Sequence, residues 1–93
     1  MSDFIDVLFT TLQDRKSNPT SQSYTASLLA EGEDEIVKKI GEEAVEVILA
    51  AKGQGNQRLI EESADLVYHL LVLLVSRDLT WDDIREELAE RQR

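Results

Sequence analysis

The chain has 93 residues, 42% of them hydrophobic, which is enough for one small domain over residues 1–93 and too few for two independent cores. Cysteine is absent, which excludes disulfides, thiolate metal ligands and cysteine nucleophiles. A formal net charge of −9 argues against nucleic-acid binding, and because no signal peptide or bilayer-length apolar run is visible, we expect a cytoplasmic protein.

Five helices are predicted, because helix-forming residues dominate and the glycines and the single proline fall between segments with helical periodicity. Asn18 and Pro19 end the first helix, since the residue before a proline resists the helical conformation. Gly32 ends a short second helix. The approximate bounds are 3–16, 24–30, 33–52, 56–77 and 81–93.

Two of the later helix starts carry capping residues. Asn56 is the expected N-cap of the fourth helix, and Thr80 with Asp83 has the pattern of a capping box at the fifth. Gln54 and Gly55 form a turn that makes the third and fourth helices an antiparallel pair. Because a helical hairpin cannot enclose a core alone, the short helices and a second copy of the chain are expected to complete the bundle. The expected fold class is all-α, with a core completed by dimerisation.

The third predicted helix carries two glutamates beside its apolar stripe. At about 100° per residue, Glu43 lies about 20° and Glu46 about 80° outside the stripe, one above the other at i, i+3. Glu42 points further into solvent. The stripe consists of Ile36, Val37, Ile40, Ala44, Val47, Ile48 and Ala51.

The fourth predicted helix repeats this arrangement. Glu62, Asp65 and His69 fall within about 60° of one another, beside a second apolar arc. Antiparallel packing places Glu62 and Asp65 at a height near that of Glu43 and Glu46. All four carboxylates are therefore expected to converge.

Converging carboxylates repel one another, by roughly 1 kcal/mol per pair at about 4 Å in water and by roughly 4 kcal/mol at an effective dielectric of about 20. A divalent cation turns this repulsion into attraction, and Mg²⁺ suits a set of oxygen ligands. Zinc is disfavoured, because the chain has no cysteine and one histidine. Paired glutamates on one helix are usually a solvated face. For two such pairs on adjacent helices, spacing alone gives about even weight to a metal site and to two solvated faces.

Basic and hydroxyl side chains near the acidic residues are candidates to hold the phosphate oxygens that a metal ion leaves free. They are Arg15, Lys16, Lys38, Lys39 and the Ser23-Tyr24-Thr25 turn. Each basic residue taken alone is more often a surface residue that aids solubility. His69, alone on an apolar helix, is more often a hydrogen-bonded structural residue than a ligand or a base.

Two segments match a known pattern: residues 38–52 read KKIGEEAVEVILAAK and residues 61–74 read EESADLVYHLLVLL. Together they resemble the phosphoribosyl-ATP pyrophosphohydrolase family. The upstream stretch over residues 15–32 is similar to the same family, so the resemblance covers nearly the whole chain. The E-x-x-E and E-x-x-D pairs alone are shared with the wider MazG-like superfamily, whereas the longer strings around them are more specific.

The resemblance implies a MazG-like all-α enzyme, a homodimer or larger assembly, that hydrolyses phosphoribosyl-ATP to phosphoribosyl-AMP and pyrophosphate in the second step of histidine biosynthesis. The motif carboxylates that it assigns to Mg²⁺ are Glu43, Glu46, Glu62 and Asp65. Glu42, Glu43 or Glu46 would accept the proton of the attacking water. The residues expected to contact the substrate are Arg15, Lys16, Ser23, Tyr24, Thr25, Lys38 and Lys39.

Two other functions fit parts of the sequence. A MazG-like housecleaning enzyme would hydrolyse ordinary or damaged nucleoside triphosphates with the same four carboxylates. The stretch over residues 15–32 favours phosphoribosyl-ATP as the substrate over these nucleotides. A non-catalytic helical dimerisation module would carry the acidic pairs as solvated faces and would gain no stability from Mg²⁺.

Overall fold

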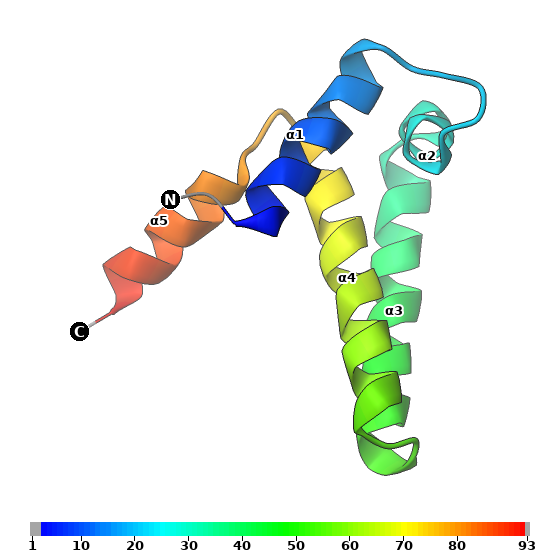
Figure 1. Cartoon of the computed structure of the whole chain (residues 1–93), viewed down its shortest axis with the longest axis vertical. Helices are drawn as coiled ribbons and strands as arrows, with labels where there is room; N and C mark the ends of the chain where they lie inside the picture. Colours follow the sequence, from blue (N-terminus) through cyan, green and yellow to red (C-terminus); the bar gives the residue numbers. More distant parts are fainter. Residues whose placement is uncertain (1–2, 93) are drawn as a thin grey trace.

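The computed structural model describes residues 3–92 and contains five α-helices (Figure 1). They are α1 (Phe4–Ser17), α2 (Tyr24–Glu31), α3 (Glu33–Gly53), α4 (Asn56–Ser76) and α5 (Trp81–Arg91). No strand occurs among residues 3–92, so the predicted all-α class is confirmed. The predicted helix bounds agree with the observed ones to one residue or better up to the last helix, whose predicted end at residue 93 lies outside the described residues.

Side chains cap three of the helix starts. Asp3 and Asp6 form a capping box at α1, and Thr80 and Asp83 form the predicted one at α5. The Ser23 hydroxyl oxygen accepts a backbone N–H in the first turn of α2. These caps explain why the short helices start where they do.

The N-cap predicted at Asn56 is wrong. Gly55 occupies the cap position with a φ of 88°, and Asn56 is already the first helical residue. Glycine has no Cβ, so it adopts this left-handed conformation at little cost. The turn therefore contains only Gln54 and Gly55, and it lays α3 and α4 antiparallel along each other (Figure 1).

The core lies at one end of the α3–α4 hairpin, where α1 and α2 pack against it (Figure 1). Its buried members are Phe9, Leu12, Leu28, Ile36, Leu71, Val72, Leu74 and Val75. The last turns of α4 are buried on several sides, because α1 and α3 both pack against them. At the other end of the hairpin, α3 and α4 project beyond the remaining helices.

Part of the predicted apolar stripe on α3 is exposed. Val37 is 43% exposed and Ile48 is 60% exposed, whereas Ala50, which the stripe omits, is 1% exposed. At about 100° per residue, Ile36 and Ala50 lie within about 20° of Glu43 on either side. The face that α4 covers is therefore centred near Glu43, and much of the apolar pattern on α3 faces solvent.

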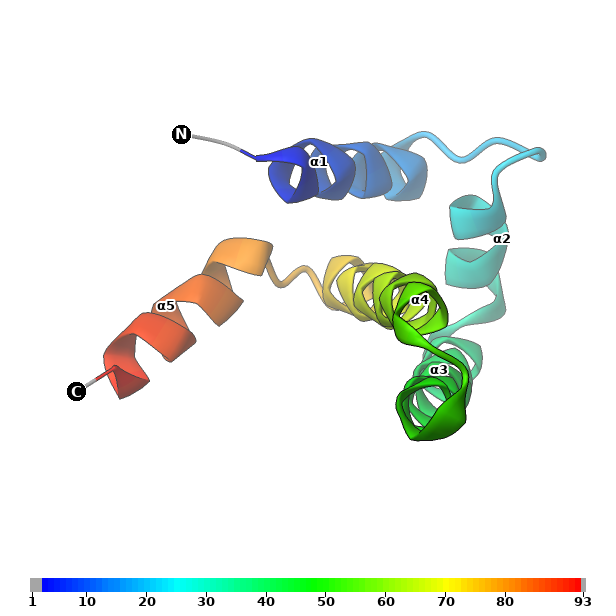
Figure 2. The same ribbon diagram turned by 60° about the horizontal axis from the view of Figure 1, so that its bottom comes forward.

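Trp81 and Ile84 of α5 pack against the core, and ion pairs add to the attachment of this outer helix. Arg85 on α5 donates to Asp6 on α1 at 2.7 Å and to Asp82 on its own helix at 2.6 Å. No residue of α5 is buried, and Figure 2 shows α5 lying apart from α3. Within residues 3–92, no helix combines the length and apolar character needed to cross a bilayer.

Candidate metal centre

Three carboxylates from the two long helices meet between α3 and α4. Glu43 on α3 and Glu62 and Asp65 on α4 each offer an oxygen atom, and these atoms all lie within 4.8 Å of one another. We call these three side chains the carboxylate cluster. Glu62 is buried, Glu43 is half-buried and Asp65 is exposed, so the cluster opens to solvent on one side.

The electrostatics of the cluster favour a cation. Burial raises the pKa of Glu43, and the negative charges of Asp65, Glu62 and Glu46 raise it further, while His69 lowers it. The ordinary environment of a carboxylate in water would produce neither effect. An all-oxygen donor set with excess negative charge suits a hard divalent cation such as Mg²⁺.

The other two glutamates of the motif lie outside this group of three. Glu46 is half-buried one turn beyond Glu43, and its charge contributes to the raised pKa of Glu43, so it borders the cluster. Glu42 is exposed and lies 3.8 Å from the ammonium group of Lys39. Because of its i, i+3 spacing from Glu43, Glu46 lies on the side of α3 that borders the cluster, whereas Glu42, the residue next to Glu43 in sequence, does not.

Arg58, which the sequence analysis did not single out, also touches the cluster. Its guanidinium group donates to Glu61 at 2.8 Å and to the carboxylate of Glu62. The hydrogen bond with Glu61 raises the pKa of Arg58 most, and the negative charge of Glu62 is the next largest cause. The i, i+3 and i, i+4 spacings of these residues on α4 were the signal that could have revealed the contact.

Tyr24 and His69 form a hydrogen-bonded pair that joins α2 to α4 beside the cluster. The Nδ1 atom of His69 lies 2.9 Å from the backbone oxygen of Asp65, and its Nε2 atom lies 2.8 Å from the hydroxyl of Tyr24. Because a carbonyl oxygen only accepts, Nδ1 carries the proton, and in the neutral ring Nε2 accepts from Tyr24. His69 is therefore hydrogen-bonded through both ring nitrogens, which agrees with the hydrogen-bonded residue that its isolation in the sequence favoured.

The Ser-Tyr-Thr turn makes its contacts within the protein. Ser23 caps α2, Tyr24 bonds to His69, and the Thr25 hydroxyl bonds to the hydroxyl of Tyr68. Burial raises the pKa of Tyr24, and the charges of Tyr68 and Glu43 raise it further, so its hydroxyl stays protonated. The turn thus fixes α2 beside the cluster.

Comparison with known proteins identifies the family. The family model described as "Phosphoribosyl-ATP pyrophosphohydrolase" matches residues 5–92. The chain belongs to this family. Curated relatives named "Phosphoribosyl-ATP pyrophosphatase" agree: one from Bacillus cereus is 47% identical over 98% of this chain and 85% of its own length. A relative from Haloarcula marismortui is 51% identical over 97% of this chain and 94% of its own length, and one from Limosilactobacillus fermentum is 51% identical over 95% and 83%.

In this member of the phosphoribosyl-ATP pyrophosphohydrolase family, most of the cations expected to contact substrate are paired with the protein itself. Lys16 donates to the backbone oxygen of Val75 at 3.2 Å and to Asp78 at 2.8 Å, and Arg15 lies 3.1 Å from Asp14. Lys16 thereby ties the end of α1 to the end of α4. Lys38 is exposed.

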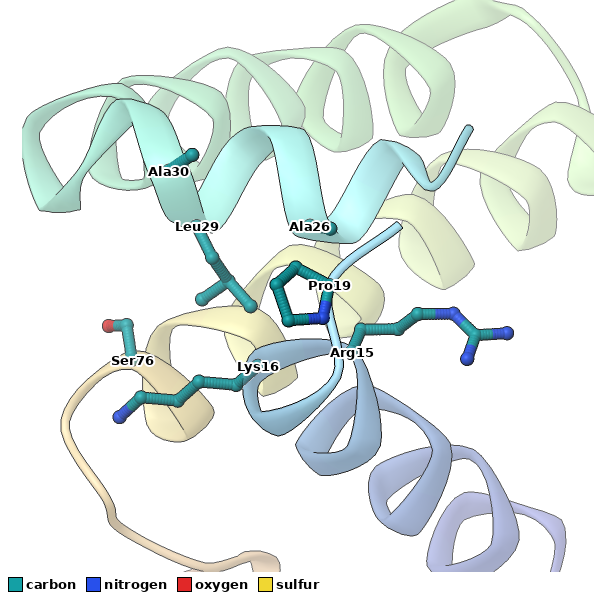
Figure 3. A pocket seen from close by; sticks show the side chains of 7 residues that line it. All are labelled: Arg15, Lys16, Pro19, Ala26, Leu29, Ala30 and Ser76. Atoms are coloured by element: carbon teal, nitrogen blue, oxygen red, sulfur yellow. The ribbon is translucent and has the colours of Figure 1, made fainter. Parts of the chain in front are cut away.

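Arg15 and Lys16 line a cavity of about 270 Å³ between α1, α2 and the end of α4 (Figure 3). On α2 the lining residues are Ala26, Leu29 and Ala30, which share one helix face, whereas Tyr24 faces His69 from another. The two cations are therefore associated with a different face of α2 from the one beside the cluster. Their role as substrate contacts stays a prediction.

Proposed function

We propose that this phosphoribosyl-ATP pyrophosphohydrolase family member hydrolyses phosphoribosyl-ATP to phosphoribosyl-AMP and pyrophosphate, the second step of histidine biosynthesis. The observation that carries the proposal is the convergence of Glu43, Glu62 and Asp65 between α3 and α4. The names of the relatives, at 47 to 51% identity over nearly the whole chain, supply the substrate. A biosynthetic reaction of this kind would take place in the cytoplasm.

The carboxylate cluster would hold Mg²⁺ through Glu43, Glu62 and Asp65, with Glu46 completing the set from one turn away. When bound, Mg²⁺ would neutralise charge on the phosphates and on the departing pyrophosphate. Glu43 and Glu62 come from facing helices, so the α3–α4 packing would position both carboxylates towards a bound cation. The substrate would approach from the exposed side at Asp65.

A carboxylate beside the cluster would accept the proton of the attacking water. Glu46 is better placed for this role than Glu42, because its charge acts on Glu43 whereas Glu42 is exposed and close to Lys39. Geometry near the reacting atoms is the first requirement for a general base. Substrate contacts by Ser23, Tyr24, Thr25 and the four basic residues belong to the same proposal.

The function is tested by measuring pyrophosphate release from phosphoribosyl-ATP, with ATP and deoxynucleoside triphosphates as parallel substrates, in Mg²⁺ and in EDTA. We expect strong preference for phosphoribosyl-ATP and complete loss of release in EDTA, because the carboxylates alone repel a polyphosphate. Preference for deoxynucleoside triphosphates would contradict the proposed substrate and assign the protein to housecleaning. No release from any substrate would contradict enzymatic activity.

A homodimer is also part of the proposed function. One end of the α3–α4 hairpin projects away from α1, α2 and α5 (Figure 1), and the two helices carry large apolar side chains that are exposed. They are Val45 at 53%, Ile48 at 60%, Leu49 at 48% and Ile60 at 61% exposure. A domain of this size buries only about 60 to 65% of its chain surface by itself, so a second copy laid against this end would add the missing burial.

Replacing Ile48 by Asp is expected to shift the assembly towards monomer, because a charge would then lie in the apolar contact. The measurement is molar mass by light scattering after size exclusion over a range of concentrations. Leu88→Asp on α5, where Leu88 is 62% exposed, provides a control of matched exposure and should remain assembled. A monomeric wild-type chain would contradict the dimer.

A further inference from the structure

Arg58 occupies a position that a metal ion bound at the cluster would compete for. It lies in the first turn of α4, and its guanidinium group contacts Glu61 at 2.8 Å through one nitrogen and Glu62 through the other. The side chain of Glu62 is 8% exposed, whereas that of Arg58 is 48% exposed. The arginine therefore reaches from the surface to the most buried carboxylate of the cluster.

A buried carboxylate is costly without a nearby positive charge or hydrogen-bond donors. Among residues 3–92, Arg58 is the cation that forms an ion pair with a carboxylate of the cluster. In the metal-free protein it supplies the positive charge that Glu62 needs. A divalent cation supplies the same charge more strongly, so the two compete for one carboxylate.

Glu61 gives the guanidinium group a second partner on the same helix. Its carboxylate is 46% exposed and accepts from Arg58 at 2.8 Å, and from the side chain of Gln57 at 3.2 Å. Because the two nitrogens of Arg58 bond to different carboxylates, the arginine can release Glu62 while it keeps Glu61.

We propose that Arg58 is a built-in counter-ion of Glu62 that a divalent cation displaces, and that it thereby sets the affinity of the carboxylate cluster for metal. The inference rests on the proposed metal-dependent function. It adds a role for a side chain outside the acidic motif. In the absence of metal, Arg58 stabilises the cluster, and in its presence Arg58 is held by Glu61.

The experiment is isothermal titration calorimetry of the full chain with Mg²⁺ alone and with Mn²⁺ alone, in the absence of substrate. Arg58→Gln removes the competitor, and we expect the cation to bind about tenfold more tightly than in the wild type, which is about 1.4 kcal/mol. Lys39→Gln is the matched control. It removes one positive charge beside the same motif from a lysine that lies 3.8 Å from Glu42, a carboxylate outside the cluster, and we expect less than a twofold change.

A second readout follows the metal-free protein. Arg58→Gln leaves Glu62 buried without its partner, so its melting temperature in EDTA should fall, and saturating Mg²⁺ should raise it by more than in the wild type. A metal affinity for Arg58→Gln equal to or weaker than that of the wild type would overturn the inference while leaving the metal site intact. An equal gain in metal affinity for Lys39→Gln would also overturn the inference, since the change in net charge would then explain the effect. If wild type and variants all fail to bind either cation, the proposed metal-dependent function fails with it.

Discussion

Replacing Glu43 by Gln is expected to lower kcat for pyrophosphate release by roughly a thousandfold, equivalent to about 4 kcal/mol of transition-state stabilisation. Glu43 is the one member of the carboxylate cluster that comes from α3. Without its charge, α3 would contribute only Glu46, which lies one turn away, and the metal would lose its ligand directly opposite Glu62 and Asp65. Steady-state kinetics with phosphoribosyl-ATP at saturating Mg²⁺ provide the measurement.

The same substitution should leave the metal-free fold intact or make it more stable. Burial and the nearby carboxylates raise the pKa of Glu43, which means that folding disfavours its charged form. The metal-free wild type therefore loses stability as the pH rises above the ordinary pKa of a glutamate and through the raised one. Gln is neutral throughout, so the melting temperature of Glu43→Gln in EDTA at neutral pH should equal or exceed that of the wild type.

Two results would refute the assignment of Glu43. Retained activity would show that the cluster does not carry the reaction, and unfolding of Glu43→Gln in EDTA would show that the carboxylate has a structural role. Glu87→Gln, which removes the same charge from the exposed helix α5, should change neither kcat nor the melting temperature appreciably. Glu46→Gln is expected to abolish turnover as well, since Glu46 borders the cluster.

Leu71→Ala is expected to lower the free energy of unfolding by about 3 kcal/mol, because truncating a fully buried leucine removes its transfer energy and leaves a cavity. Leu71 is 0% exposed and belongs to the core formed by α1, α2, α3 and α4. For a domain of this size, that loss corresponds to a fall in melting temperature of very roughly 12 to 24 °C. Urea denaturation followed by circular dichroism would measure it.

Leu88→Ala is the matched control, since it makes the same change on a side chain that is 62% exposed. We expect it to cost less than about 0.5 kcal/mol. If the two variants lost similar stability, the core would not lie where α1 and α2 meet the hairpin. Since many domains are stable by only about 5 kcal/mol, Leu71→Ala should also reduce the amount of folded protein at elevated temperature.

The helices could be predicted because their ends are determined by residues close to them in the sequence. The stops at Pro19 and Gly32 and the capping box of Thr80 and Asp83 each depend on a few neighbouring residues. The convergence of Glu43 with Glu62 and Asp65 followed from helical spacing combined with a short turn. Both kinds of argument use distances of one or two helical turns, over which the geometry of a helix is fixed.

Features that depend on the orientation of whole helices could not be predicted. The apolar pattern on α3 gave the wrong centre for its buried face, because Val37 and Ile48 have apolar side chains but face away from α4. Lys16 donates a hydrogen bond to Asp78, which lies 62 positions further along the chain, and no rule of local spacing predicts this contact. Arg58 was missed for another reason. Its spacing from Glu61 and Glu62 predicts both contacts, but a single basic residue at a helix start is not a specific sign of a functional site.

The short turn at Gln54 and Gly55 also bears on the order in which the protein assembles. The entropy lost in closing a loop grows with its length, so joining α3 to α4 across two residues costs far less than bringing α1 to the end of α4, as the contact between Lys16 and Asp78 requires. Both sides of the carboxylate cluster lie on this hairpin. We therefore expect the two sides of the cluster to come together in the most local step of folding, before the distant contacts of α1 and α5 form.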